Sequence, residues 1–205
     1  MRPEQLHAAL SGTPGVEWLR EALERVAAEP DGIGRLFAAA GRRCGRSPLP
    51  DMPGWTADEA ARALLLHALS TSYAADPDKL AARVEDLYRH GDAAEKRAVL
   101  KALPLLPIGE QTVPLLHDAI RTNDSRLVAA ALGPCARHLD QAMWRQAVLK
   151  CVFMDVPLSV VDRLTERADA ELATMLAGLV EERRAAGRDV PADVLDLLAQ
   201  LTEEA

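Results

Sequence analysis

Alanine and leucine dominate this chain: Ala occurs 37 times and Leu 31 times among its 205 residues. Residues that favour β-strands are scarce, since Ile occurs 3 times, Val 14 times, and aromatic residues make up 3% of the chain. Helices favour Ala, Leu, Glu and Arg, whereas strands favour β-branched and aromatic residues. The composition therefore predicts an all-α fold.

Helix start signals recur along the sequence. Thr56 and Glu59 have the spacing of a capping box, in which two side chains satisfy free backbone N–H groups of the first helical turn. Further N-cap signals stand at Asp76, Asp92, Asp140 and Asp169. We expect helices over residues 15–29, 31–43, 109 to about 122, 124–132, 157 to about 164 and 169–187. Other helices are expected to begin near residues 56, 76, 92, 140 and 191.

The sequence predicts where the helices lie more closely than how they pack together. Short helices joined by short loops indicate stacked antiparallel pairs, as in a degenerate HEAT-like α-solenoid. The sequence has no clean repeat period, so an irregular helical bundle is the alternative. The segment 45–54 contains Pro48, Pro50 and Pro53 and is the best internal boundary. The pieces that flank it are short, and we expect one domain over residues 1–205.

Charge and apolar patterning exclude several function classes. The formal net charge is −7, and a nucleic-acid binder normally needs a basic surface, so no nucleic-acid partner is expected. No apolar run approaches the length of a membrane span, and residues 1–15 lack the apolar core of a signal peptide. The three cysteines, Cys44, Cys135 and Cys151, are odd in number and widely spaced, which argues against a disulfide framework. We expect a reduced, cytoplasmic protein.

Motifs that carry catalytic chemistry are missing from the sequence. It contains no glycine-rich phosphate loop, no HExxH zinc motif and no GxSxG nucleophile motif. His67 and Cys151 each lie in an apolar helical stretch, and we interpret both as residues of the structural core. We therefore expect no cofactor, no metal ligand and no catalytic residue that the sequence alone can name.

Four polar residues are candidate ligand-binding residues. Arg121 and Asn123 lie where one predicted helix ends and the next begins, a place where a guanidinium can hold a phosphate or carboxylate. The alternative is helix capping, with Arg121 paired to an acid. Arg62 and Lys150 lie inside the apolar runs 60–66 and 147–153. Each either extends its charge to the surface or presents a cation to a pocket.

The sequence resembles the EboA family over about residues 33–198. Family members carry an Arg-Thr-Asn run, a tryptophan-containing helix with a Val-Leu-Lys motif, and later an Arg-Ala-x-x-Glu-Leu stretch. The matching residues here are Arg121-Thr-Asn123, Trp144, Gln146, Val148-Leu-Lys150, Phe153, Pro157-Leu158, Arg163, Arg167-Ala168, Glu171-Leu172, Met175-Leu176, Glu182-Arg183 and Ala185-Ala-Gly-Arg188. Upstream, Trp55, Ala60-Ala-Arg62 and Leu103-Pro-Leu-Leu-Pro107 also fit.

The chain departs from the family pattern at several positions. Family members often have an Asn-Pro segment before the tryptophan helix, where this chain has residues 131–139 without one. An asparagine often follows the tryptophan, and here that residue is Arg145. Another asparagine often follows the Arg-Ala pair, and here that residue is Asp169. These differences weaken the transfer of any site detail.

The resemblance implies a helical accessory protein without an assigned catalytic activity. EboA-type proteins are encoded in a small bacterial gene cluster beside a prenyltransferase-like membrane protein and barrel-fold enzymes. The cluster is linked to the movement of secondary-metabolite precursors toward the periplasm. The expected partners are therefore these cluster proteins, a small anionic metabolite, or both.

Three functions are consistent with the sequence. The first is a non-catalytic accessory or scaffold protein that binds partner enzymes or a metabolite. The second is an enzyme that acts on an anionic or prenylated metabolite and uses Arg62, Arg121, Asn123 and Lys150, with the cations as clamps. The third is a general helical-repeat interaction domain. The second hypothesis requires these four side chains to converge on one pocket.

Overall fold

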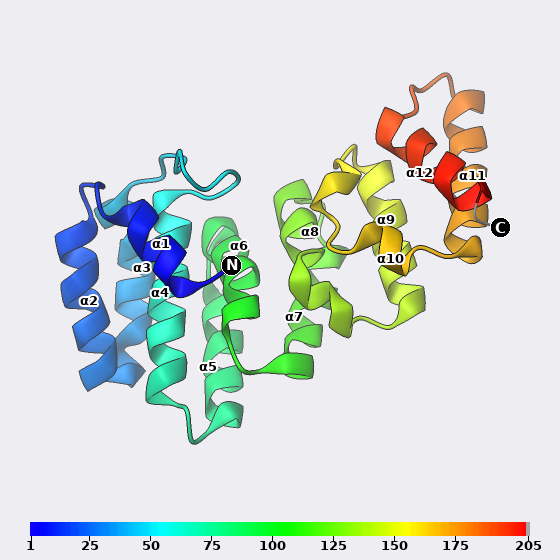
Figure 1. Ribbon diagram of the computed structural model, residues 1–205. Coiled ribbons are helices and arrows are strands. Elements are labelled where there is room, and N and C mark those ends of the chain that lie inside the picture. Colours follow the sequence, from blue (N-terminus) through cyan, green and yellow to red (C-terminus); the bar gives the residue numbers. More distant parts are fainter. Residues whose placement is uncertain (204–205) are drawn as a thin grey trace. The chain divides into compact units, whose positions relative to one another are not determined.

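The computed structural model describes residues 1–203, which contain twelve α-helices and no β-strand (Figure 1). The predicted all-α fold is confirmed. The chain divides into two compact units, Met1–Leu115 and Leu116–Ala205, and each unit is described by itself. The single domain and the HEAT-like solenoid stay predictions.

Unit 1 is built around one central helix. Its helices are α1 (Pro3–Leu10), α2 (Val16–Ala28), α3 (Ile33–Cys44), α4 (Ala57–Ser72), α5 (Pro77–His90) and α6 (Ala93–Ala102). Short 3₁₀ turns lie at η1 (Pro30–Gly32), η2 (Leu103–Leu105) and η3 (Gly109–Thr112). Helix α4 packs against α1, α2, α3, α5 and α6, and residues 57–66 are all buried. The expected capping boxes at Thr56 and Asp92 begin α4 and α6.

Burial of α4 includes the charged side chain of Arg62, which is 1% exposed. Its Nη1 lies 2.6 Å from Oδ2 of Asp58, its Nε donates to the Phe37 carbonyl at 3.0 Å, and its Nη2 lies 3.7 Å from Oε1 of Glu95. The guanidinium also stands 5.4 Å from the centre of the Phe37 ring. Buried charges persist where ion pairs and hydrogen bonds satisfy them, as they do here.

A second buried acid, Glu59, anchors α6 to the start of α4. Its carboxylate accepts from the backbone N–H of Thr56 and pairs with Lys101 at 2.6 Å and with Arg97 at 3.0 Å. Burial lowers the pKa of Lys101, whose ammonium also lies 4.0 Å from the centre of the Trp55 ring. The first turn of α4 is thus fixed to α6 by charged groups as well as by apolar packing.

Unit 2 contains the remaining helices. They are α7 (Val113–Arg121), which includes the boundary between the units, α8 (Ser125–Ala131), α9 (Gln141–Phe153), α10 (Leu164–Arg167), α11 (Ala170–Ala185) and α12 (Ala192–Glu203). Two 3₁₀ turns lie at η4 (Pro134–His138) and η5 (Leu158–Val160). Helix α9 packs against α8, η5 and α11, and α11 packs against α12. Trp144 of α9 is fully buried.

The helix expected from 157 to about 164 is wrong. The segment forms the short turn η5, and Arg163 then adopts a left-handed conformation with φ of 54°. Its backbone donors are used by tertiary contacts: Leu158 N–H binds the Asp193 carboxylate at 2.7 Å, and Asp162 N–H binds the Leu132 carbonyl at 2.9 Å. In a helix, the Asp162 N–H would donate to the Leu158 carbonyl, so its bond to Leu132 replaces a helical bond. The Leu158 N–H would have no partner inside such a helix.

We predict that Arg62→Met destabilises the protein by about 3–5 kcal/mol, because it removes the buried cation of Asp58 and leaves that carboxylate only the exposed Arg46 at 3.9 Å. The matched control is Arg20→Met, since Arg20 pairs with Glu17 and Glu24 on the surface and its side chain is 59% exposed. The control should change the free energy of unfolding by less than about 1 kcal/mol. Urea unfolding followed by circular dichroism measures both, and equal effects would contradict this account.

Candidate functional site

Helix α9 carries apolar side chains on two faces. One face is buried in unit 2 and consists of Trp144, Ala147, Val148, Cys151 and Val152. Outside that face, Gln146, Leu149, Lys150 and Phe153 of α9, and Met154 just beyond its end, line a groove. Phe153 is one of two phenylalanines in the chain and is 65% exposed. The surface is mixed, because apolar Leu149, Phe153 and Met154 lie beside polar Gln146 and Lys150.

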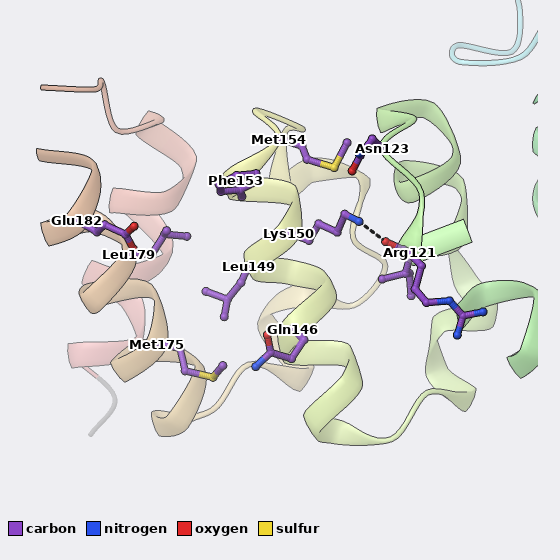
Figure 2. A pocket seen from close by; sticks show the side chains of 11 residues that line it. Arg121, Asn123, Gln146, Leu149, Lys150, Phe153, Met154, Met175, Leu179 and Glu182 are labelled. Carbon is purple, nitrogen blue, oxygen red and sulfur yellow. Dashed lines mark hydrogen bonds between the residues drawn. The ribbon is translucent and has the colours of Figure 1, made fainter. Parts of the chain in front are cut away.

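The groove has a volume of about 840 Å³ and lies within unit 2 (Figure 2). Eleven residues line it, from the end of α7, the α7–α8 connection, α9 and α11. They are Ile120, Arg121, Asn123, Gln146, Leu149, Lys150, Phe153, Met154, Met175, Leu179 and Glu182. Ligand pockets in proteins commonly have volumes of about 300–1,000 Å³ and mostly apolar walls, and this groove fits both criteria.

Helix α11 forms one wall of the groove and repeats the pattern of α9. Its buried face carries Leu172, Leu176 and Val180. Met175 and Leu179 lie one residue away from these positions and line the groove. In Figure 2, Leu149 and Gln146 lie on the side of α9 that faces Met175 and Leu179. Apolar residues of α9 and α11 therefore face each other across the groove.

The Lys150 side chain points to the side of α9 that is opposite to Leu149. Its ammonium is partly buried and donates a hydrogen bond to the Ile120 carbonyl at 2.6 Å, close to the end of α7 (Figure 2). No carboxylate among residues 1–203 forms an ion pair with this ammonium. The side chain is thus held in place by a neutral acceptor and keeps donor capacity for another group.

In the Arg121-Thr-Asn123 run, Thr122 supports the start of α8, and Arg121 and Asn123 line the groove. Thr122 Oγ1 donates to the Ala119 carbonyl and accepts from Asp124 N–H, and Asp124 is the N-cap of α8. The Arg121 side chain is 73% exposed, lies 3.8 Å from Asp118 and directs its guanidinium away from α9 (Figure 2). Asn123 is exposed, lines the groove and makes no side-chain hydrogen bond with the described residues.

The structure brings together three of the four predicted ligand-binding residues. Arg121, Asn123 and Lys150 all line the groove, whereas Arg62 lies in the buried network of unit 1 and is not a lining residue. The sequence interpretation did not single out Phe153, Met175 or Leu179 as site residues. The available signal was that α9 and α11 carry apolar residues outside their buried faces, which marks a second contact surface.

An ion pair joins the two helices that form the groove. Arg145 of α9 pairs with Asp169 at 2.6 Å and with Glu171 at 2.6 Å. Asp169 is the N-cap of α11, accepts from Leu172 N–H at 3.0 Å, and accepts from Gln141 at 2.9 Å. The hydrogen bond from Arg145 holds the pKa of Asp169 well below its usual range. Arg145 and Asp169 are two of the departures from the family pattern, and they contact each other.

Thiol chemistry has no support at this site. Burial raises the pKa of Cys44 and of Cys135 to about 11 and that of Cys151 to about 12, so these thiols stay protonated at neutral pH. Within residues 1–203, no group of three or more His, Cys, Asp or Glu side chains is placed to hold a metal ion.

No helix in the described part of the chain has the length and apolar character that crossing a membrane requires.

Comparison with known proteins identifies the family. The family described as metabolite traffic protein EboA matches residues 41–199. The chain belongs to the EboA family. The matched region contains α4–α11 and every residue that lines the groove. No curated protein and no solved structure matches this EboA-family chain.

We predict that Asp169→Ala lowers the free energy of unfolding by about 1–2 kcal/mol at pH 7, because it removes an N-cap that is also an ion-pair partner. The pKa of Asp169 is lower in the folded state than in the unfolded state, where it is about 3.9. The stabilisation is therefore present above about pH 4 and is lost as the pH falls toward the folded-state pKa.

Urea unfolding at pH 7 and pH 3 measures this dependence. The difference between wild type and Asp169→Ala should shrink at pH 3. Asp196→Ala is the matched control, because Asp196 is an exposed carboxylate on α12. A difference for Asp169→Ala that stays constant between the two pH values would show that its carboxylate charge does not stabilise the fold.

Proposed function

We propose that this chain is a non-catalytic accessory protein of metabolite traffic that holds a small metabolite in the groove between α9 and α11. The observation that carries the proposal is the set of apolar residues on the groove side of α9, with Phe153 65% exposed. Exposed apolar surface lowers solubility and is typically kept where a ligand or partner covers it. Membership of a metabolite-traffic family supports a metabolite as that ligand.

The size of the groove favours a small molecule over a protein partner. Its volume of about 840 Å³ falls within the range of small-molecule sites. A stable protein interface uses about 20–30 residues on each side, and eleven residues line this groove. A metabolite with a largely apolar body fits both figures.

The arrangement of charged groups supports binding rather than catalysis. The enzyme hypothesis requires Arg62, Arg121, Asn123 and Lys150 to converge, but Arg62 is satisfied within unit 1 and the Arg121 guanidinium points away from α9. The titratable side chains among the lining residues are Arg121, Lys150 and Glu182. In Figure 2, Lys150 and Glu182 come from different helices and point in different directions, so they do not form an acid–base pair.

Membership of the family supports a proposal for the cellular role. We propose that the protein works in the cytoplasm with the proteins of its gene cluster, a prenyltransferase-like membrane protein and barrel-fold enzymes. It would keep an apolar metabolite out of water between these partners and pass it on toward the periplasm. The match to a metabolite-traffic family supports this role.

We predict that Phe153→Ala weakens the binding of N-phenylnaphthylamine, an uncharged apolar fluorescent probe, by about tenfold, because burial of an aromatic side chain contributes about 1.5–3 kcal/mol. Fluorescence titration measures the affinity. Leu195→Ala is the matched control, since Leu195 is 38% exposed on α12 and is not a groove residue. Equal affinities for wild type and Phe153→Ala would reject the groove as the binding site.

A further inference from the structure

The partly buried cation in the groove, Lys150, forms no ion pair within the described residues. The Lys150 ammonium is partly buried, and its contact among the described residues is the neutral Ile120 carbonyl at 2.6 Å. From this, and building on the proposed function, we infer that the metabolite is an organic acid whose anionic group pairs with Lys150 while its flat apolar body covers Phe153.

The partial burial of the Lys150 ammonium makes its lack of an ion pair relevant to ligand binding. Removing an ammonium from water is unfavourable unless an anion or several hydrogen bonds compensate it, so partly buried cations are normally paired. Two other partly buried cations of unit 2 are paired with acids: Arg145 with Asp169 and Glu171, and Arg183 with Asp155. A third, Arg167, has no acid partner and is satisfied by several hydrogen bonds to neutral acceptors, whereas Lys150 has one such bond. Lys150 has three N–H donors and uses one on the Ile120 carbonyl. An acid in the groove would accept from the other two.

A second polar group stands at the same end of the groove. The Asn123 amide has no hydrogen-bond partner among residues 1–203 and lies on the α7–α8 side, as Lys150 does (Figure 2). Its NH₂ group can donate to a carboxylate or phosphate oxygen that Lys150 holds. Arg121 is the weaker candidate for this contact, because its guanidinium points away and lies near Asp118.

The opposite end of the groove sets the orientation of the ligand. Glu182 lies on α11, and its carboxylate repels an acidic group placed there. An acid therefore binds with its charge at the α7–α8 side and its apolar body across α9 toward Leu179. Phe153 offers a ring face, and the Met154 and Met175 thioethers make favourable contacts with aromatic rings. These groups favour a flat, unsaturated body over a flexible alkyl chain.

Two probes of similar shape and different charge test the inference. Anilinonaphthalene sulfonate is a flat organic anion, and N-phenylnaphthylamine is its uncharged counterpart. Lys150→Met keeps the length of the side chain and removes its charge. We expect Lys150→Met to weaken the sulfonate by about tenfold and to leave the uncharged probe within about twofold of wild type. The affinity of wild type for the sulfonate alone should fall as salt is added.

Matched variants separate the inference from the proposed function. Lys150→Arg retains the charge and should keep sulfonate binding, which guards against a folding defect in Lys150→Met. Arg184→Gln, at an exposed position of α11 that does not line the groove, should leave both probes unchanged. Phe153→Ala should weaken both. Circular dichroism and thermal unfolding establish that each variant is folded.

Each contrary outcome has a definite meaning. If Lys150→Met binds the sulfonate as wild type does while Phe153→Ala weakens both probes, the groove stands and the anion inference is overturned. If Phe153→Ala also changes neither affinity, the proposed function fails with it. Retention of wild type, but not of Lys150→Met, on phosphatidylglycerol vesicles would identify a membrane surface as the anion and would overturn the inference of a small organic acid.

Discussion

Helix α9 carries apolar residues on two faces, and the organisation of unit 2 depends on that fact. One face, centred on the fully buried Trp144, packs into the core and positions α8 and α11. The other face remains at the surface and forms the floor of a groove of about 840 Å³. A helix needs one apolar stripe to pack in a small domain, and we propose that a bound metabolite covers the apolar residues outside that stripe. The same argument applies to α11, which contributes Met175 and Leu179.

Charged groups fix the geometry of each unit in different ways. In unit 1, Arg62 and Glu59 are buried and hold α4 against α3 and α6. In unit 2, Arg145 and Asp169 tie α9 to the first turn of α11.

Local sequence signals predicted the fold class. Features that depend on contacts between distant residues were not predicted from those signals. Capping residues such as Thr56 and Asp169 placed helix starts correctly, since an N-cap depends on neighbouring residues alone. The helix expected from 157 is wrong because the Leu132 carbonyl, distant in the sequence, accepts from the Asp162 N–H that a helix would have used. In the site, Lys150 was singled out as a cation in an apolar run, but Phe153 was not. Periodicity does not distinguish the buried face of α9 from the open one when both carry apolar residues.

The most direct test of the central claim is mass spectrometry of the small molecules that co-purify with the tagged chain from the organism that encodes it. Wild type and Phe153→Ala would be purified in parallel. The account predicts one metabolite enriched with wild type and depleted with Phe153→Ala, at equal yields of folded protein. A metabolite retained equally by both proteins, or cluster proteins retained with no metabolite, would contradict it.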